Sequence, residues 1–138
     1  MTTEEIAREY FEAWNRRDFD RAESLVAEDA EIIDFDGTVY HGPAGARSNS
    51  ELYATAFPDG RIEIKRITAV GDTAVAELVG HGTNDGPFGD VPATHREAAL
   101  PFCDVLTIRG GKIVRDRAYG DTGTMLKQLG LMPEPAHV

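Results

Sequence analysis

A change in hydrophobic period near residue 60 is the feature that most limits what this 138-residue chain can fold into. Before it, apolar side chains recur every three or four residues, as in Ile6, Tyr10 and Trp14, which is typical of an amphipathic helix. After Gly60 the apolar residues follow the period of strands, separated by glycine-containing turns. Helices followed by a meander of strands indicate the α+β class, with helices packed against one antiparallel sheet.

Two helices are predicted in the first 29 residues. Thr2 and Glu5 have the spacing of a capping box, which predicts the start of the first helix. Asp18 or Asp20 can cap a second, short helix, which should close at residues 28–29. A long and a short helix are therefore expected before the first strand.

A short hairpin and a third helix should follow. Residues 32–35 favour a strand, the turn Asp36-Gly37 can reverse the chain, and residues 39–41 can pair back. Gly42-Pro43 then predicts the start of the third helix, because proline is well accommodated in a first helical turn.

Four strands and a terminal helix are predicted in the second half. The strands are expected around residues 62–67, 75–81, 96–108 and 112–120, with a loop rich in glycine, proline and aspartate from Thr83 to Thr94. Asp121 should cap the last helix, and Gly130 is its natural C-terminal stop. One domain over residues 1–132 is expected, with a flexible tail at 133–138.

Charge and composition exclude several function classes. The chain has 24 acidic and 14 basic side chains, and this net charge of −10 argues against nucleic-acid or anionic-membrane binding. No apolar run approaches the ~20 residues of a membrane span and the polar N-terminus shows no signal peptide, so a cytoplasmic protein is expected. Cys103 is the single cysteine and should be a buried thiol. No metal site is expected, because the histidines lack metal-ligand spacing: His41, His81, His95 and His137.

Three parts of the chain resemble the nuclear-transport-factor-2-like superfamily: residues 10–34, the meander, and residues 110–130. Within it, LPFCDVLTIRGGKIV, followed by an aspartate and a helix ending in QLG, is most similar to the SnoaL-like polyketide cyclase family. The resemblance implies one α+β domain shaped as a cone, a barrel-like curved antiparallel sheet packed on a long N-terminal helix and two to three shorter helices. A pocket should lie between sheet and helix. This fold also hosts isomerases, epoxide hydrolases and non-catalytic binders, so the function must be argued from the site.

Asp121 is the preferred general acid/base by this resemblance, since SnoaL-like cyclases use an aspartate at the matching position for an aldol closure. An apolar pocket would raise the pKa of such a carboxyl group. Strict alternation also puts Arg117 and Tyr119 on the same strand face as Asp121. If Arg117 pairs with Asp121, it would lower that pKa instead.

Tyr10, Asp34 and Asp104 together resemble the ketosteroid isomerase triad. The resemblance implies that Asp34 is the base, and that Tyr10 and a protonated Asp104 donate hydrogen bonds to the enolate oxygen. Asp104 interrupts an apolar strand, so its carboxyl group needs a partner or must be neutral.

Other residues complete the candidate site. His81 follows a strand and can face the pocket, where it would pair with an aspartate. A limonene-type epoxide hydrolase is disfavoured, because Leu78 and Gly80 stand where that enzyme needs an arginine and a second aspartate. The charged residues 115–117 are expected on a solvated or dimer-facing surface. Aromatic residues should form the substrate-binding walls: Trp14, Tyr53, Phe57, Phe102 and Tyr119.

The sequence thus predicts a cofactor-free enzyme that moves protons next to the carbonyl group of a small apolar compound, by aldol-type cyclisation or enol isomerisation. Two other classes stay open: a non-catalytic small-molecule-binding protein, and an interaction protein that uses the open sheet face. The resemblance implies a homodimer through that face in each case.

Overall fold

The elements follow the predicted order of helices with a short hairpin, then a meander of strands, then a terminal helix. The computed structural model describes residues 1–132, and the predicted flexible tail lies outside them. The helices are α1 (Thr3–Asn15), α2 (Phe19–Ser24), α3 (Gly42–Ala56) and α4 (Thr122–Gln128). The strands are β1 (Val26–Ile33), β2 (Val39–His41), β3 (Arg61–Val70), β4 (Thr73–Thr83), β5 (Glu97–Arg109) and β6 (Lys112–Gly120).

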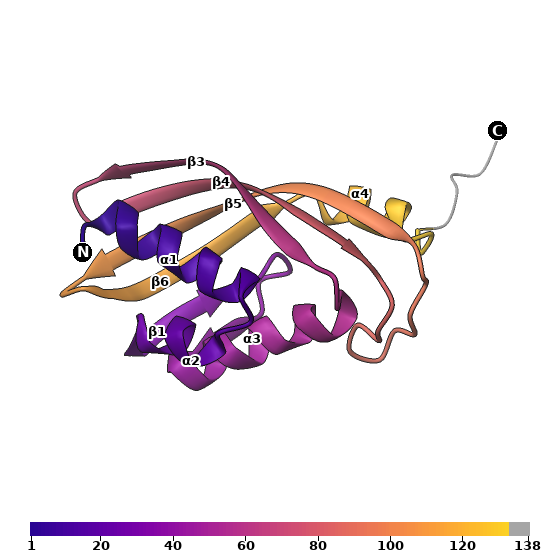
Figure 1. Ribbon diagram of the computed structural model, residues 1–138, viewed down its shortest axis with the longest axis horizontal. Coiled ribbons are helices and arrows are strands. Elements are labelled where there is room, and N and C mark those ends of the chain that lie inside the picture. Colours follow the sequence, from indigo (N-terminus) through magenta and orange to yellow (C-terminus); the bar gives the residue numbers. More distant parts are fainter. Residues whose placement is uncertain (133–138) are drawn as a thin grey trace.

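The strands form one curved sheet in the order β2-β1-β6-β5-β4-β3 (Figure 1). The predicted hairpin and meander are confirmed, since β1 with β2 and each successive pair from β3 to β6 are antiparallel. The expectation of a wholly antiparallel sheet is wrong at one pairing, because β1 lies parallel to β6, with Ile32 beside Asp116. Hydrophobic period does not encode strand direction, so the sequence pattern could not reveal this contact.

The helices α1, α2 and α3 lie on one side of the sheet, as Figure 1 shows. The apolar stripe of α1, which includes Ile6 and Phe11, packs with Leu106 and Ile113 in the main core. The predicted capping box at Thr2 is present, with the Thr2 and Glu5 side chains each accepting from the other's backbone N–H. The α+β class and the packing of helices on one sheet face are confirmed.

The second helix is shorter than predicted. Asp18 caps α2, but the helix ends at Ser24, and Val26 begins β1 instead of continuing the helix. Both Leu25 and Val26 are buried, and a short apolar pair fits a helix face as well as a strand, so the pattern alone could not separate them.

The outer face of the sheet carries Cys103, Arg117 and Tyr119. Cys103 pairs with Tyr119 across β5 and β6, and the Arg117 guanidinium lies 5.1 Å from the centre of the Tyr119 ring. Cys103 is only partly buried, so its predicted burial is incomplete. The homodimer through this face stays a prediction. Within residues 1–132, no helix combines the length and apolarity needed to cross a membrane.

Candidate active site

A cavity of about 160 Å³ lies between the inner face of the sheet, α1 and α3. An apolar cavity of roughly 150 Å³ holds a benzene-sized molecule, so this one accommodates a single ring. Trp14, Tyr53, Phe57 and Phe102, the predicted apolar walls, all line it. The predicted wall residue Tyr119 does not, because it is 52% exposed on the opposite face.

Two glycines of β4 leave the space open. Gly80 and Gly82 both line the cavity. A Cβ atom on Gly80 would meet the Phe102 ring at 3.4 Å, an ordinary contact distance. A Cβ atom on Gly82 would lie 3.0 Å from Phe57 Cβ and 3.3 Å from Gly60 Cα, so the chain there is already in close contact.

Two aspartates from neighbouring strands face this cavity. Asp104 on β5 and Asp116 on β6 are each 5% exposed and both line it. The Oδ1 atom of each is buried, and within residues 1–132 no hydrogen-bond donor outside the pair reaches either atom. Burial raises the pKa of Asp104 to about 6, although a hydrogen bond with Asp116 opposes the rise.

The two carboxyl groups share their ionisation. Burial, followed by the charge of Asp104, raises the pKa of Asp116 well above its usual range. Like charges this close disfavour a double negative charge, so one carboxyl is ionised near neutrality while the other keeps its proton. The pair therefore holds a base and an acid in one apolar site.

Tyr10 brings a phenol to the same cavity from α1. Burial, and then the charges of Asp116 and Asp104, raise the pKa of Tyr10 well above its ordinary value. The phenol therefore keeps its proton and can donate a hydrogen bond.

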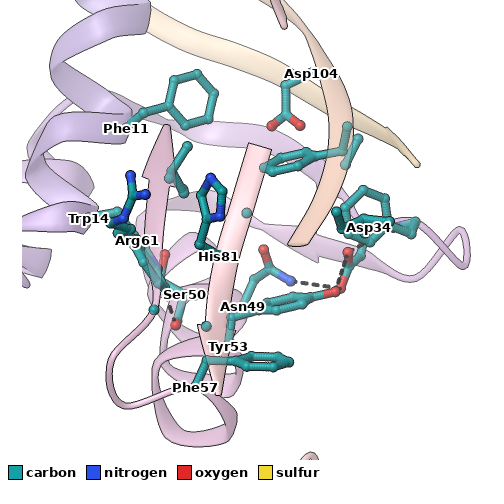
Figure 2. Close-up of a pocket in the computed structure, with 18 of the residues that line it drawn as sticks. Phe11, Trp14, Asp34, Asn49, Ser50, Tyr53, Phe57, Arg61, His81 and Asp104 are labelled. Carbon is teal, nitrogen blue, oxygen red and sulfur yellow. Dashed lines mark hydrogen bonds between the residues drawn. The ribbon is translucent and has the colours of Figure 1, made fainter. Parts of the chain in front are cut away.

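Asp34, which follows β1, accepts hydrogen bonds from three residues, of which Asn49 and Tyr53 are labelled in Figure 2. The Phe35 N–H donates to Oδ1 over 2.7 Å, and Asn49 Nδ2 donates to Oδ2 over 3.0 Å. The Tyr53 hydroxyl lies 2.9 Å from Oδ1 and 3.0 Å from Oδ2. Burial, and then the charge of Asp34, raise the pKa of Tyr53, so this hydroxyl keeps the proton that it donates.

His81 lies at the cavity wall, but its partner is a glutamate and not the predicted aspartate. His81 Nε2 is 2.9 Å from Glu63 Oε1, and this hydrogen bond is the main reason that the pKa of Glu63 is lowered. Arg61 and His81 also line a polar groove that continues from the cavity toward Gln128. Within residues 1–132, no three metal-binding side chains of histidine, cysteine, aspartate or glutamate form a group that could hold a metal ion.

The expectation that Asp121 enters an apolar pocket is wrong. Asp121 is exposed, and it caps α4 by accepting from Thr124 N over 3.0 Å and from Thr124 Oγ1 over 2.6 Å. These hydrogen bonds lower its pKa, whereas a pocket would have raised it. The Arg117 side chain does not contribute to this lowering of the Asp121 pKa. On β6, Asp116 and Ala118 line the cavity. Because successive side chains of a strand point to opposite faces, an odd-numbered residue such as Asp121 is directed away from the cavity.

Asp116 was expected on a solvated or dimer-facing surface with its charged neighbours, but it is buried at the cavity. A break in the pairing of β5 with β6 explains the error. Thr107 pairs with Arg115 and Ile108 with Ile113, so one residue of β6 is unpaired between them. Such an irregularity moves the following side chains to the other face of the strand. The buried Ile113 is therefore followed on the inner face by Asp116 and not by Arg115.

The comparisons with known proteins agree with this architecture. The model of the SnoaL-like polyketide cyclase family matches residues 4–129, so the chain belongs to that family. No curated protein sequence matches the chain significantly.

Solved structures show the same fold. The putative polyketide cyclase IdmH from Streptomyces antibioticus is 27% identical, with a TM-score of 0.82 over 94% of this chain and 99% of that one. A putative SnoaL-like polyketide cyclase from Jannaschia sp. is 20% identical, with a TM-score of 0.86 over 95% and 93% of the two chains. A hypothetical protein with a ketosteroid isomerase-like fold from Catenulispora acidiphila, in complex with trimethylamine, is 23% identical, with a TM-score of 0.81 over 95% and 96%.

Proposed function

We propose that the protein catalyses proton transfer at a carbon next to the carbonyl group of a small, largely apolar compound, with Asp104 and Asp116 as the acid/base pair. The observation that carries this proposal is the pair itself, two buried carboxyl groups in one ring-sized apolar cavity. Membership of the cyclase family supports a cyclase or isomerase type of reaction.

The ionised member of the pair takes the proton from the carbon, which leaves an enolate. Its negative oxygen accepts a hydrogen bond from the protonated carboxyl or from the Tyr10 phenol. In an isomerisation, the first carboxyl returns its proton to a different carbon. In an aldol cyclisation, the enolate carbon bonds to a second carbonyl carbon, and the resulting alkoxide receives the proton. Each route restores the pair and needs no cofactor.

A second assignment keeps the reaction but changes the base. Tyr10, Asp34 and Asp104 all line the cavity, which favours the isomerase-like triad expected from the sequence. Asp34 would then take the proton, and Asp104 with Tyr10 would hold the enolate oxygen. This assignment predicts that Asp34→Asn abolishes turnover while Asp116→Asn leaves much of it.

Deuterium exchange tests the proposal without knowledge of the natural substrate. Cyclohexanone and 3-cyclohexenone fit a ring-sized cavity, and NMR in D2O follows exchange at the α-carbon or migration of the double bond. Asp104→Asn and Asp116→Asn should each lower the rate by at least ~10²-fold, the scale of general acid–base catalysis.

Asp121→Asn is the matched control, because it removes a carboxylate outside the cavity. Its rate should stay close to that of the wild type. Full activity in both Asp104→Asn and Asp116→Asn would contradict the proposed pair. Ring-sized ketones that bind without any exchange would support the non-catalytic binding protein instead.

A further inference from the structure

The charge balance of the cavity is negative. Asp34, Asp104 and Asp116 line it, with one proton shared by the last two, whereas the cationic lining residues within the described part of the chain are Arg61 and, when protonated, His81. His81 is already bound to Glu63. In Figure 2, Arg61 lies on the far side of the cavity from Asp34, and the Asp104 carboxyl group points into the space between them.

The carboxyl pair also has unused hydrogen-bonding capacity. The Oδ1 atoms of Asp104 and Asp116 are buried, and within residues 1–132 no donor outside the pair contacts them. A buried acceptor without a donor is costly, so such atoms indicate a ligand that brings its own donor. An N–H group with a positive charge satisfies both the missing donor and the missing charge.

The remaining walls suit the apolar part of such a ligand. Aromatic rings from α1 and β5, among them Tyr10, Phe11 and Phe102, line the cavity. Aromatic rings attract organic cations as well as alkyl groups. The volume of about 160 Å³ admits an amine with a few alkyl carbons.

We propose that the cavity binds a small alkylammonium ion, whose N–H groups donate to Asp104 and Asp116. This proposal goes beyond the proposed function, because binding requires no reaction and applies equally to a non-catalytic protein. The ligand class is a protonated primary to tertiary amine with a compact alkyl group.

Binding of a cation should be coupled to the ionisation of the pair. A nearby positive charge favours the ionised carboxylate, so the ammonium ion and the shared proton compete. Besides the pair, the titratable or charged side chains that line the cavity or act on the pair are Tyr10 on α1, Asp34 after β1, Arg61 on β3, His81 on β4 and Arg115 on β6. Because the pKa of Asp104 is about 6, the affinity for the cation should rise about tenfold between pH 5 and pH 8.

Calorimetry with two probes of the same shape tests this proposal. tert-Butylammonium chloride is a cation at both pH values, and tert-butanol is its neutral counterpart with a hydroxyl donor. The ammonium ion should bind at least tenfold more tightly than the alcohol at pH 8, and only the ammonium affinity should rise with pH. Equal affinities for the two probes, or an ammonium affinity that does not change with pH, would overturn the proposal.

Substitution then locates the site. Asp104→Asn and Asp116→Asn should each weaken ammonium binding at least tenfold and leave tert-butanol binding nearly unchanged. Asp121→Asn removes an equal charge outside the cavity and should change neither affinity. Ammonium binding that survives in both cavity variants would place the cation elsewhere and overturn the proposal. The rate of ketone exchange is measured separately and decides only the proposed function, so the two proposals can fail independently.

Discussion

Asp104 and Asp116 are diagonal neighbours on the inner face of the sheet, because Asp104 pairs with Ala118 and Asp116 pairs with Leu106. Two successive inward positions on neighbouring strands thus bring two carboxyl groups into one apolar cavity. Their burial makes the double negative charge unfavourable, which keeps a proton in the site at neutral pH.

The first prediction concerns the dependence of stability on pH. The pKa of Asp104 in the folded protein, about 6, lies above its ordinary value of 3.8. The folded state therefore binds more protons than the unfolded state between these values, and stability falls as pH rises through them. The shift lowers the free energy of unfolding at neutral pH by about 3 kcal/mol.

Asp104→Asn removes the loss of stability caused by ionisation of Asp104, because the amide cannot ionise. The variant should be more stable than the wild type in urea unfolding at pH 8, and the difference should disappear near pH 3. Asp29→Asn, at an exposed position, is the control and should show no such gain. If Asp104→Asn loses stability equally at both pH values, then the wild-type carboxyl group is not destabilised by its ionisation.

The second prediction uses the two cavity glycines. Gly80→Ala places a methyl group at ordinary contact distance from Phe102 and should fold normally while it reduces the cavity. Binding of cyclohexanone should weaken several-fold, as measured by NMR. Gly82→Ala forces its methyl group against Phe57 and the backbone of Gly60, and should cost roughly 1–3 kcal/mol of stability. Comparable melting temperatures for the two variants would mean that the close contact at Gly82 relaxes freely.

The third prediction concerns the hydrogen bond that the Tyr53 hydroxyl donates to the Asp34 carboxylate. Tyr53→Phe removes this donor and leaves Asn49 and the Phe35 N–H in place. Loss of a hydrogen bond to a charged group should lower the free energy of unfolding by about 1.5–3 kcal/mol. Urea unfolding measures the change. Tyr40→Phe is the matched control on β2, and a similar change in both variants would exclude a specific contact.

The fourth prediction concerns the loop between β4 and β5. Asn84 is fully buried, and its side chain donates to Ala56 O and Gly86 O and accepts from Thr94 N and Oγ1. Asn84→Ala leaves buried groups unpaired, at about 1–3 kcal/mol each. The Thr94 amide should then exchange its hydrogen faster.

This loop also bears on the site, because Phe88 packs on Tyr53 with ring centres 5.2 Å apart.

Asn15→Ala is the control for Asn84→Ala. Asn15 makes two similar hydrogen bonds to the backbone of Ile62, but at an exposed position, where water can replace them. A larger loss of stability in Asn15→Ala than in Asn84→Ala would contradict the role of burial.

Most of the fold was predictable from the sequence, because caps and periodicity are local signals. The capping aspartates Asp18 and Asp121, the glycine-containing turns and the long strands follow from residues close together in the chain. The parallel contact between β1 and β6 joins distant segments, and no local pattern reports it.

The site was only partly predictable for the same reason. Tyr10, Asp34 and Asp104 were identified and do meet at the cavity. Asp116 was missed and Asp121 was misplaced, because the irregular pairing near Ile113 reverses the faces of β6 after that residue. A one-residue irregularity leaves no clear mark in the composition of a strand, yet it decides which carboxyl group faces the ligand.

Carboxyl NMR titration of Asp104 and Asp116 tests the central claim most directly and needs no substrate. Selectively 13C-labelled aspartate, assigned with Asp104→Asn and Asp116→Asn, would report both groups from pH 3 to pH 9. The proposed pair predicts two linked steps, both above the ordinary aspartate value, with the first near pH 6. Two independent transitions near pH 4 would contradict the account, because the cavity would then hold two ordinary carboxylates and no shared proton.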